Sequence, residues 1–358
     1  VMESELSVVL KNGAKVRLYG ADNPDSLRGN YFDGVIIDEY GDITPRLFGE
    51  VIAPTLADRK GWCVFIGTPK GRNHFFDLWE DAARSNGWFT SMLKASQSGI
   101  IDAEELEMLK NSPGSDENTY RQEFECDFAA AVRGAYYGDQ LNELEATHCG
   151  SYPHDPDKQV LLAFDIGYSD DTSIWFYQPN GQDFAITDFF TVAGYSVDDV
   201  LAHLRGKPYA YGTFYLPHDA KNKSFQTGKS VRELMQSAGC QTQIVPSLSV
   251  QDGIQAVRKT LPHCYFNTVN ADVRQGFSAL RTYQRQWDDK RQIFKEQPLH
   301  DWTSNPADAF RMLALAMNPA ATRKGAQVIN HTSLPTNVVT LDRLFAEREA
   351  RQSDVRRI

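Results

Sequence analysis

One stretch of the sequence decides the fold: Leu161-Leu162-Ala163-Phe164-Asp165-Ile166-Gly167. A continuous apolar run of this length, followed by glycine, predicts a strand buried in a sheet. A carboxylate inside such a strand costs free energy unless it is paired or binds a cation. Asp165 is therefore the first candidate for a functional residue.

The pattern continues with two more strand-like stretches, 173–178 and 183–190, which are separated by a turn at Pro179-Asn180-Gly181. Gaps this short predict antiparallel neighbours. Helices are then expected at 196–205, 228–238 and 250–261, and strands at 211–217 and 243–245. Three antiparallel strands followed by alternating helix and strand are the element order of the ribonuclease H fold, so we expect an α/β domain with a mixed sheet.

Two further acids follow elements that this order brings near Asp165. Asp219 comes directly after the strand at 211–217, which lies beside the first strand in the ribonuclease H order. We therefore expect Asp219 across from Asp165. Asp308 is expected in the first turn of a helix that Asn305 opens.

Carboxylates that converge from two strands and a helix suit a pair of divalent cations, which activate water and stabilise the leaving oxygen of a phosphodiester. The sequence therefore predicts two Mg²⁺ or Mn²⁺ ions on Asp165, Asp219 and Asp308. Asp301 competes with Asp308 for the third place, or serves as an outer ligand. Any one of these acids alone is equally well explained by a helix cap or a salt bridge.

The amino-terminal half also alternates apolar runs with helical stretches, which indicates a second α/β sheet. The runs at 35–38 and 63–67 are typical of buried parallel strands. Helices are expected at 46–56, 74–85 and 117–126, and after a capping box formed by Asp102 and Glu105.

The strand at 35–38 ends in the pair Asp38-Glu39. In ATPases an acid at this place holds Mg²⁺ and a second residue orients the attacking water, and Asp38 and Glu39 fit these two roles. The next strand ends in Gly67-Thr68-Pro69, a small polar turn placed to sense the γ-phosphate. An apolar strand with a capped end gives the same residue pattern by chance. The ATPase interpretation therefore depends on both strands together.

No phosphate-binding G-x-x-x-x-G-K-[ST] motif precedes Asp38. The nearest match, Thr227-Gly228-Lys229-Ser230, lacks the first glycine because position 223 is lysine. We expect this stretch to begin the helix at 228–238 and to bind no phosphate.

Six segments resemble those of the tailed-bacteriophage terminase large subunits, in the family's order: 35–40, 67–69, 120–128, 164–173, 217–220 and 305–311. The resemblance implies a partial P-loop-type ATPase sheet followed by a ribonuclease H-like nuclease, without the amino-terminal P-loop part. It implies ATP-driven translocation of DNA into procapsids and cutting of concatemeric viral DNA. In some members a basic residue at the place of Arg28 reaches the ATP of a neighbouring subunit, and a surface salt bridge is the alternative for this arginine.

The resemblance also implies partners and cofactors. The partners are double-stranded DNA, a small terminase subunit and the portal protein of the procapsid, with self-assembly into a ring at the portal. The cofactors are two Mg²⁺ or Mn²⁺ ions at the nuclease site, and ATP with Mg²⁺ in the complete motor. The expected location is the host cytoplasm during virion assembly. Basic residues near the proposed site are candidates for DNA contacts, with a solvated face as the alternative: Lys221, Lys223, Lys229 and Arg232.

These observations predict four segments: the carboxyl-terminal part of an ATPase domain at 1–128, a linker at 129–157, the nuclease at 158–318 and a polar tail at 319–358. The basic and aromatic stretch 283–295 is expected to form a hairpin.

Bulk composition narrows the class of protein. A net charge of −10 argues against a passive nucleic-acid coat, although a carboxylate metal site is itself acidic. The 5 scattered cysteines, with no CxxC pair, favour reduced thiols. No stretch suits a membrane span, and the first residues do not resemble a signal peptide, so we expect neither membrane insertion nor secretion.

Two other functions remain open at this point. A ribonuclease H-like recombinase or resolvase would share the metal site but leaves Asp38-Glu39 unexplained. A non-catalytic portal-docking module would use the acids structurally and would bind no paired Mg²⁺ or Mn²⁺.

Overall fold

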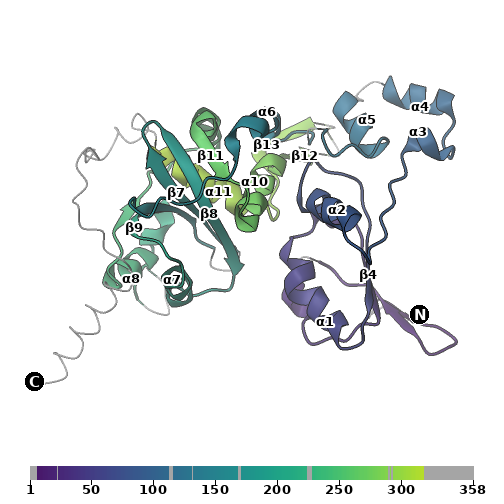
Figure 1. Cartoon of the computed structure of the whole chain (residues 1–358), viewed down its shortest axis with the longest axis horizontal. Coiled ribbons are helices and arrows are strands. Elements are labelled where there is room, and N and C mark those ends of the chain that lie inside the picture. The colour runs from purple at the N-terminus through teal and green to yellow at the C-terminus, as the bar shows by residue number, and fades with distance from the viewer. Residues whose placement is uncertain are drawn as a thin grey trace, which may run out of the picture.

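The computed structural model describes residues 6–21, 23–112, 116–130, 132–167, 171–223, 228–288, 291 and 293–317. The predicted polar tail at 319–358 lies outside these residues. Figure 1 shows two units, an amino-terminal one that contains β4 and a larger one built on a long sheet. This arrangement agrees with the α/β class expected for both halves.

The amino-terminal unit is built on two parallel strands, β3 (Gly34–Ile37) and β4 (Trp62–Phe65). A π-helical stretch, Leu47–Ile52, runs into α1 (Ala53–Ala57) between them. We expected a single α-helix here, but Pro54 has no N–H to donate, so the regular hydrogen-bond ladder cannot run through it. The remaining elements are a hairpin and four helices: β1 (Ser7–Val9), β2 (Lys15–Arg17), α2 (His74–Arg84), α3 (Ala95–Ser98), α4 (Ala103–Lys110) and α5 (Glu117–Glu123).

One face of this small sheet is exposed. Ile36, Trp62 and Val64 are 61%, 57% and 40% accessible, whereas Ile37 on the opposite face is 4% accessible. The prediction that both strands are buried was therefore wrong for one face, because nothing in the described part of the chain covers it. The predicted capping box of α4 is also absent, since Asp102 makes no side-chain hydrogen bond at that helix start.

The larger unit contains a seven-stranded sheet in the order β10-β9-β6-β7-β8-β11-β5. Its strands are β5 (Cys149–Gly150), β6 (Val160–Asp165), β7 (Asp171–Asn180), β8 (Asp183–Ala193), β9 (Tyr211–Leu216), β10 (Thr242–Ile244) and β11 (Cys264–Asn267). β6, β7 and β8 are antiparallel, while β9 is parallel to β6 and β10 is parallel to β9. The predicted ribonuclease H order is confirmed.

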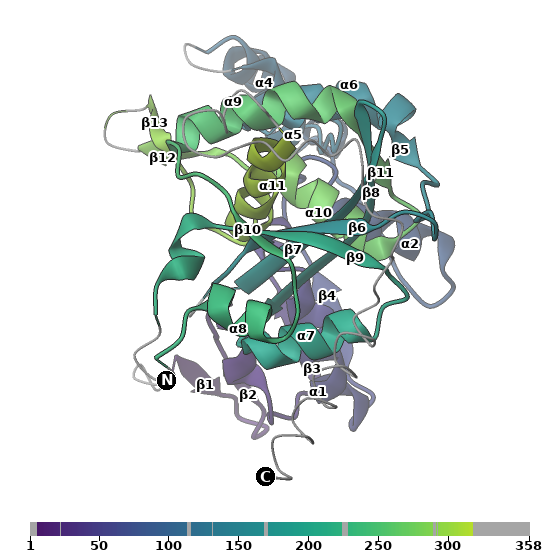
Figure 2. The ribbon, with the colours of Figure 1, turned by 90° about the vertical axis from the view of Figure 1, so that its left-hand side faces the viewer.

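Helices cover both faces of this sheet (Figure 2). They are α6 (Gly138–His148), α7 (Val197–Arg205), α8 (Val231–Ser237), α9 (Val250–Thr260), α10 (Ala271–Thr282) and α11 (Ser304–Met317). α7 and α8 pack on one face, and α6, α9, α10 and α11 pack on the other. Ser230 caps α8 and shares a capping box with Glu233, which confirms that the described part of this stretch, residues 228–230, leads into a helix.

The predicted linker at 129–157 is largely part of the larger unit. Tyr136, Tyr137 and Leu141 are buried in its core, and the Tyr136 amide donates to the carbonyl of Tyr283 at 2.9 Å. These side chains pack against partners that lie far away in the sequence, so the segment itself shows no hydrophobic periodicity. The predicted hairpin at 283–295 is confirmed as β12 (Arg285–Asp288) and β13 (Ile293–Pro298).

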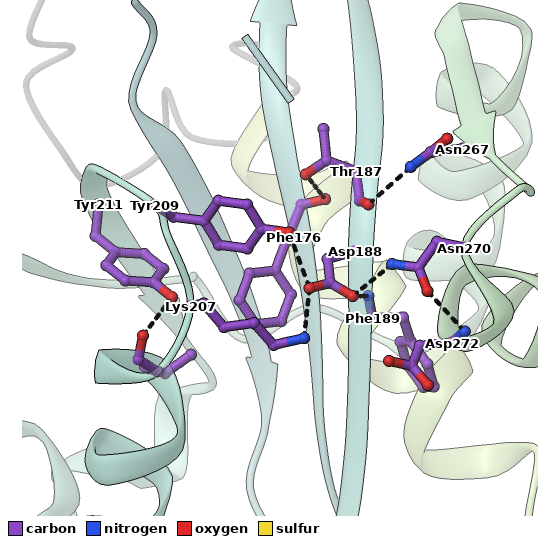
Figure 3. Close-up of polar contacts among 11 residues, drawn as sticks. Phe176, Thr187, Asp188, Phe189, Lys207, Tyr209, Tyr211, Asn267, Asn270 and Asp272 are labelled. Atoms are coloured by element: carbon purple, nitrogen blue, oxygen red, sulfur yellow. Dashed lines mark hydrogen bonds and ion pairs between the residues drawn. The ribbon is translucent and has the colours of Figure 1, made fainter. Parts of the chain in front are cut away.

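A buried polar network joins β8 to neighbouring segments (Figure 3). Asp188 is 1% accessible and accepts hydrogen bonds from Lys207 at 2.7 Å, Tyr209 at 3.0 Å and the side-chain amide of Asn270 at 2.9 Å. The carboxylate is thus satisfied from the α7–β9 connection and from the start of α10.

The two units touch through charged side chains. Arg72, just before α2, pairs with Glu145 of α6 at 3.1 Å, and Arg281 of α10 pairs with the same carboxylate at 3.0 Å. Arg46 lies 3.8 Å from Asp171 at the start of β7. All five cysteines are free, as predicted. None of the helices in the described part of the chain has the length and apolar character needed to cross a bilayer.

Candidate functional site

Two of the predicted acids lie at the same edge of the long sheet. Asp165 is the last residue of β6, and β9 pairs alongside β6 with Ala163 opposite Tyr215. β9 ends at Leu216, and Asp219 follows in a short 3-10 turn. Because parallel neighbours end at the same edge of a sheet, their carboxyl ends bring the two acids together.

The third acid reaches this edge from α11, which packs across β6 and β7. The indole N–H of Trp175 on β7 donates to the carbonyl of Pro306 at 2.8 Å and holds the start of the helix against the sheet. α11 begins at Ser304, so Asp308 lies in its second turn rather than in the first as predicted.

The three acids act on one another electrostatically. Burial, with the negative charges of Asp308 and Asp219, raises the pKa of Asp165 to about 7, while Arg311 opposes the shift. Burial also raises the pKa of Asp308. The Oδ1 atom of Asp219 is buried and, among the described residues, has no hydrogen-bond partner. A buried carboxylate oxygen without a donor is costly unless a cation binds it.

Three further residues of this site were missed in the sequence. Arg311, one turn after Asp308 on α11, lies with Nη2 2.6 Å from its Oδ1. Tyr283 donates a hydrogen bond to Asp308, and the hydroxyl of Tyr137 is buried within the field of Asp308 and Arg311. Tyr137 comes from the segment expected to be a linker, and no local pattern marked any of the three.

Asp301 plays a different structural part. It accepts hydrogen bonds from the amide of Thr303 at 2.9 Å and from the Thr303 hydroxyl at 2.6 Å, directly before α11. This is the geometry of a turn that leads into a helix, the alternative that the sequence left open. The charges that act on Asp165 include Asp308, which favours Asp308 for the third place.

The donor set suits a hard divalent cation, which prefers oxygen ligands. In the described part of the chain, however, no three His, Cys, Asp or Glu side chains are close enough to one another to hold a metal ion. The Arg311 guanidinium is instead the cation nearest to Asp308. The residues thus fit a divalent ion in chemistry, although the described side chains are not drawn together around one ion, and an ion on Asp308 must contend with Arg311.

In the amino-terminal unit, the structure places the two predicted ATPase motifs side by side. The Tyr40 amide donates to the carbonyl of Ile66 at 3.1 Å, and Glu39 has a left-handed backbone with φ +49°. Gly67 is required here, because a Cβ at this position would lie 3.2 Å from the Cα of Glu39. Asp38 and Glu39 are both exposed, and the Glu39 amide donates to Asp38 Oδ1 at 3.1 Å.

Two residues that the sequence analysis missed hold the loop after Glu39. Asn73 is fully buried and donates from its side chain to the carbonyl of Gly41 at 3.0 Å. His74 bonds through Nε2 to the carbonyl of Tyr40 at 2.8 Å, and its ring meets that of Trp302 at 5.3 Å between centroids. Burial lowers the pKa of His74 to about 4, so the ring is neutral and Nε2 is the donor. His74 thus links this loop to the segment that leads into α11.

The remaining candidates show surface contacts. Arg28 pairs with Asp25 at 2.7 Å and donates to the carbonyl of Glu50 at 3.2 Å. Within a single chain it therefore forms the surface salt bridge that was the alternative to a contact with a neighbouring subunit's ATP. Lys221, Lys223 and Lys229 are exposed, whereas Arg232 is partly buried. Lys221 belongs to the same 3-10 turn as Asp219, so a cation does lie beside that acid in the sequence and in the fold.

Together, the sheet order and the acids at its edge define a ribonuclease H-like domain with a carboxylate site, joined to a smaller α/β unit with two parallel strands. Residues 2–142 match the family described as terminase large subunit, T4likevirus-type, N-terminal. The terminase large subunit of Thermus phage G20c is 27% identical over 246 residues, which are 61% of this chain and 48% of that protein. The terminase large subunit of Escherichia phage T5 is 23% identical over 319 residues, 85% of this chain and 70% of its own.

Solved structures of large terminases also align with the chain. The large terminase of a thermophilic bacteriophage, solved in complex with ADP, has a TM-score of 0.40 and 14% identity, over 87% of this chain and 77% of its own. The magnesium-bound large terminase nuclease of phage G20c has a TM-score of 0.35 and 14% identity, over 52% and 97%. The family match and the curated relatives confirm the resemblance, and the chain is related to the terminase large subunits. It spans about half the length of its Thermus phage relatives.

Proposed function

We propose that the larger unit is a metal-dependent endonuclease that cuts concatemeric double-stranded viral DNA. The observation that carries this proposal is the cluster of Asp165, Asp219 and Asp308 at one sheet edge, with a buried oxygen of Asp219 that has no partner among the described residues. An acid-rich site of this kind disfavours phosphate unless cations bind first. Asp165, Asp219 and Asp308 would hold two Mg²⁺ or Mn²⁺ ions.

The bound ions would supply an activated water and charge stabilisation at the leaving oxygen. The chain's own residues would keep the three carboxylates in place. Trp175 fixes the start of α11 through Pro306, and the Tyr283 hydroxyl orients Asp308. Lys221 and Lys223, both exposed after β9, would contact DNA phosphates near Asp219.

The amino-terminal unit would belong to the ATP-driven motor that moves DNA into procapsids. Asp38 would hold Mg²⁺, Glu39 would orient water, and Gly67-Thr68 would respond to the γ-phosphate. Arg28 would act on a neighbouring subunit's nucleotide in a ring at the portal. The partners would be the portal protein and a small terminase subunit, in the host cytoplasm during virion assembly. A resolvase function would not account for the family match over residues 2–142.

Plasmid cleavage tests the nuclease proposal. The purified chain should nick or cut supercoiled DNA with Mn²⁺ or Mg²⁺ and leave it intact with EDTA. Asp165→Ala, Asp219→Ala and Asp308→Ala should each lose at least about a hundredfold in rate with the fold retained, as loss of a group that acts on the transition state does.

Asp199→Asn is the matched control, because this acid caps α7 on the other face of the sheet and should leave cleavage unchanged. Full activity of Asp165→Ala would refute the site. Preference for four-way junctions over linear duplex would favour a resolvase, and absence of bound Mn²⁺ would favour a structural module.

A further inference from the structure

Arg311 stands among the acids of the candidate nuclease site. It lies one helical turn after Asp308, its side chain is only 12% accessible, and Nη2 is 2.6 Å from Asp308 Oδ1. Tyr283 donates a hydrogen bond to the same carboxylate. The Oδ1 atom of Asp308 therefore already has a cation of this chain beside it, whereas the buried Oδ1 atom of Asp219 has neither a hydrogen-bond partner nor an ion pair in the described structure.

The arginine stem is held in place by packing. A Cβ added to Gly253 on α9 would lie 3.0 Å from Arg311 Cδ, so the absence of a side chain there makes room for the stem. The Nε atom of Arg311 is buried and lacks a hydrogen-bond partner among the described residues. A buried side chain confined in this way cannot swing into solvent at little cost.

The guanidinium also weakens the negative field that would attract cations. Its Nη2 atom lies 2.6 Å from Asp308 Oδ1, so a positive charge stands directly against that carboxylate. A first divalent ion on Asp165 and Asp219 would bind acids that form no ion pair with Arg311 among the described residues. A second ion on Asp308 meets a fixed positive charge at close range, in a site where like charges repel strongly.

We infer that Arg311 and a second divalent cation are alternative partners of Asp308. The free site then binds one ion tightly, through Asp165 and Asp219, and a second ion weakly. This inference rests on the proposed metal-dependent function, and it identifies Arg311 as the positioning residue that controls occupancy at Asp308.

Mn²⁺ titration of the full chain, followed by the electron paramagnetic resonance signal of free Mn²⁺, tests the inference. Wild type should show one tight ion and a second that binds at least tenfold more weakly. Arg311→Met should tighten the second ion by about tenfold or more, the size of effect that groups around metal ligands commonly have. Arg311→Lys should fall between the two. Arg274→Met, which removes an arginine that bonds to the carbonyl of Thr268, is the control of equal charge change and should match wild type.

A second measurement covers the case in which Arg311→Met does not fold. Asp308→Asn should lose the weak ion and keep the tight one, because the tight ion is held by Asp165 and Asp219. Three results would overturn this inference without affecting the proposed function. They are two equally tight ions in wild type, an unchanged affinity for the second ion in folded Arg311→Met, or the loss of both ions in Asp308→Asn. Absence of any ion that Asp165→Asn removes would defeat the proposed function as well.

Discussion

Replacing Asp165 by asparagine should stabilise the metal-free protein while it abolishes nuclease activity. Asparagine keeps the shape of the side chain and removes the charge that burial disfavours. In the folded protein the pKa of Asp165 is raised from 3.8 to about 7, chiefly by burial and then by the Asp308 charge. Folding therefore disfavours the ionised form.

The sign and size follow from linkage. A raised pKa means that the protonated acid is the form that suits the fold, so stability is lost as pH rises from about 4 through about 7. The difference corresponds to about 4 kcal/mol above pH 7, at 1.36 kcal/mol for each pH unit. Solvent screening and the shared charge of the three acids reduce this, and we expect about 2 kcal/mol at pH 8.

The assay is urea unfolding in EDTA, followed by tryptophan fluorescence and circular dichroism, at several values between pH 4 and pH 8. Asp165→Asn should equal wild type near pH 4 and become progressively more stable up to pH 7, after which the difference levels off. Asp199→Asn is a control of opposite sign: hydrogen bonds from Ser196 lower the pKa of Asp199, so this variant should lose stability relative to wild type as pH rises. An Asp165→Asn protein that is less stable than wild type at pH 8, or a difference without pH dependence, would refute the reasoning.

Two other predictions address the rest of the chain. Lys207→Met should destabilise the larger unit by about 3–5 kcal/mol in urea unfolding, because it leaves the buried carboxylate of Asp188 without its ammonium partner; a loss below about 1 kcal/mol would contradict this. The 358-residue polypeptide should hydrolyse no ATP by itself, since Asp38 and Glu39 require a phosphate-binding loop that its sequence does not contain. Steady phosphate release that Glu39→Gln abolishes would show that the nucleotide is held elsewhere.

Local pattern was sufficient for much of the larger unit. The strands that became β6, β7 and β8 were predicted because each is a short apolar run bounded by turn residues, and such runs gain most of their stability from burial. The parallel pairing of β9 with β6 then placed Asp165 and Asp219 at a common edge. β11 was not assigned, because Cys264–Asn267 is too short to show a hydrophobic period. The helix α10 that follows it was not assigned either.

The sequence misjudged features whose partners lie far along the chain. The predicted linker lacks a regular pattern, yet Tyr137 and Leu141 are buried in one core with residues of α10 and α11. The apolar residues on the exposed face of β3 and β4 led to the prediction of buried strands, because an apolar pattern does not show which face of a strand is covered. Asp102 has the letters of a capping box without the hydrogen bond.

By itself, therefore, the sequence determined the fold class and the two acids that end neighbouring strands at one sheet edge, since hydrophobic period and strand order act through near neighbours in the chain. Only the tertiary structure decided how those acids are balanced. Arg311 lies three residues from Asp308, but its burial depends on Gly253 of α9, and the hydroxyls of Tyr137 and Tyr283 arrive from two other segments. The charge and the burial of a site depend on every segment that packs around it, so they are set only when the chain has folded.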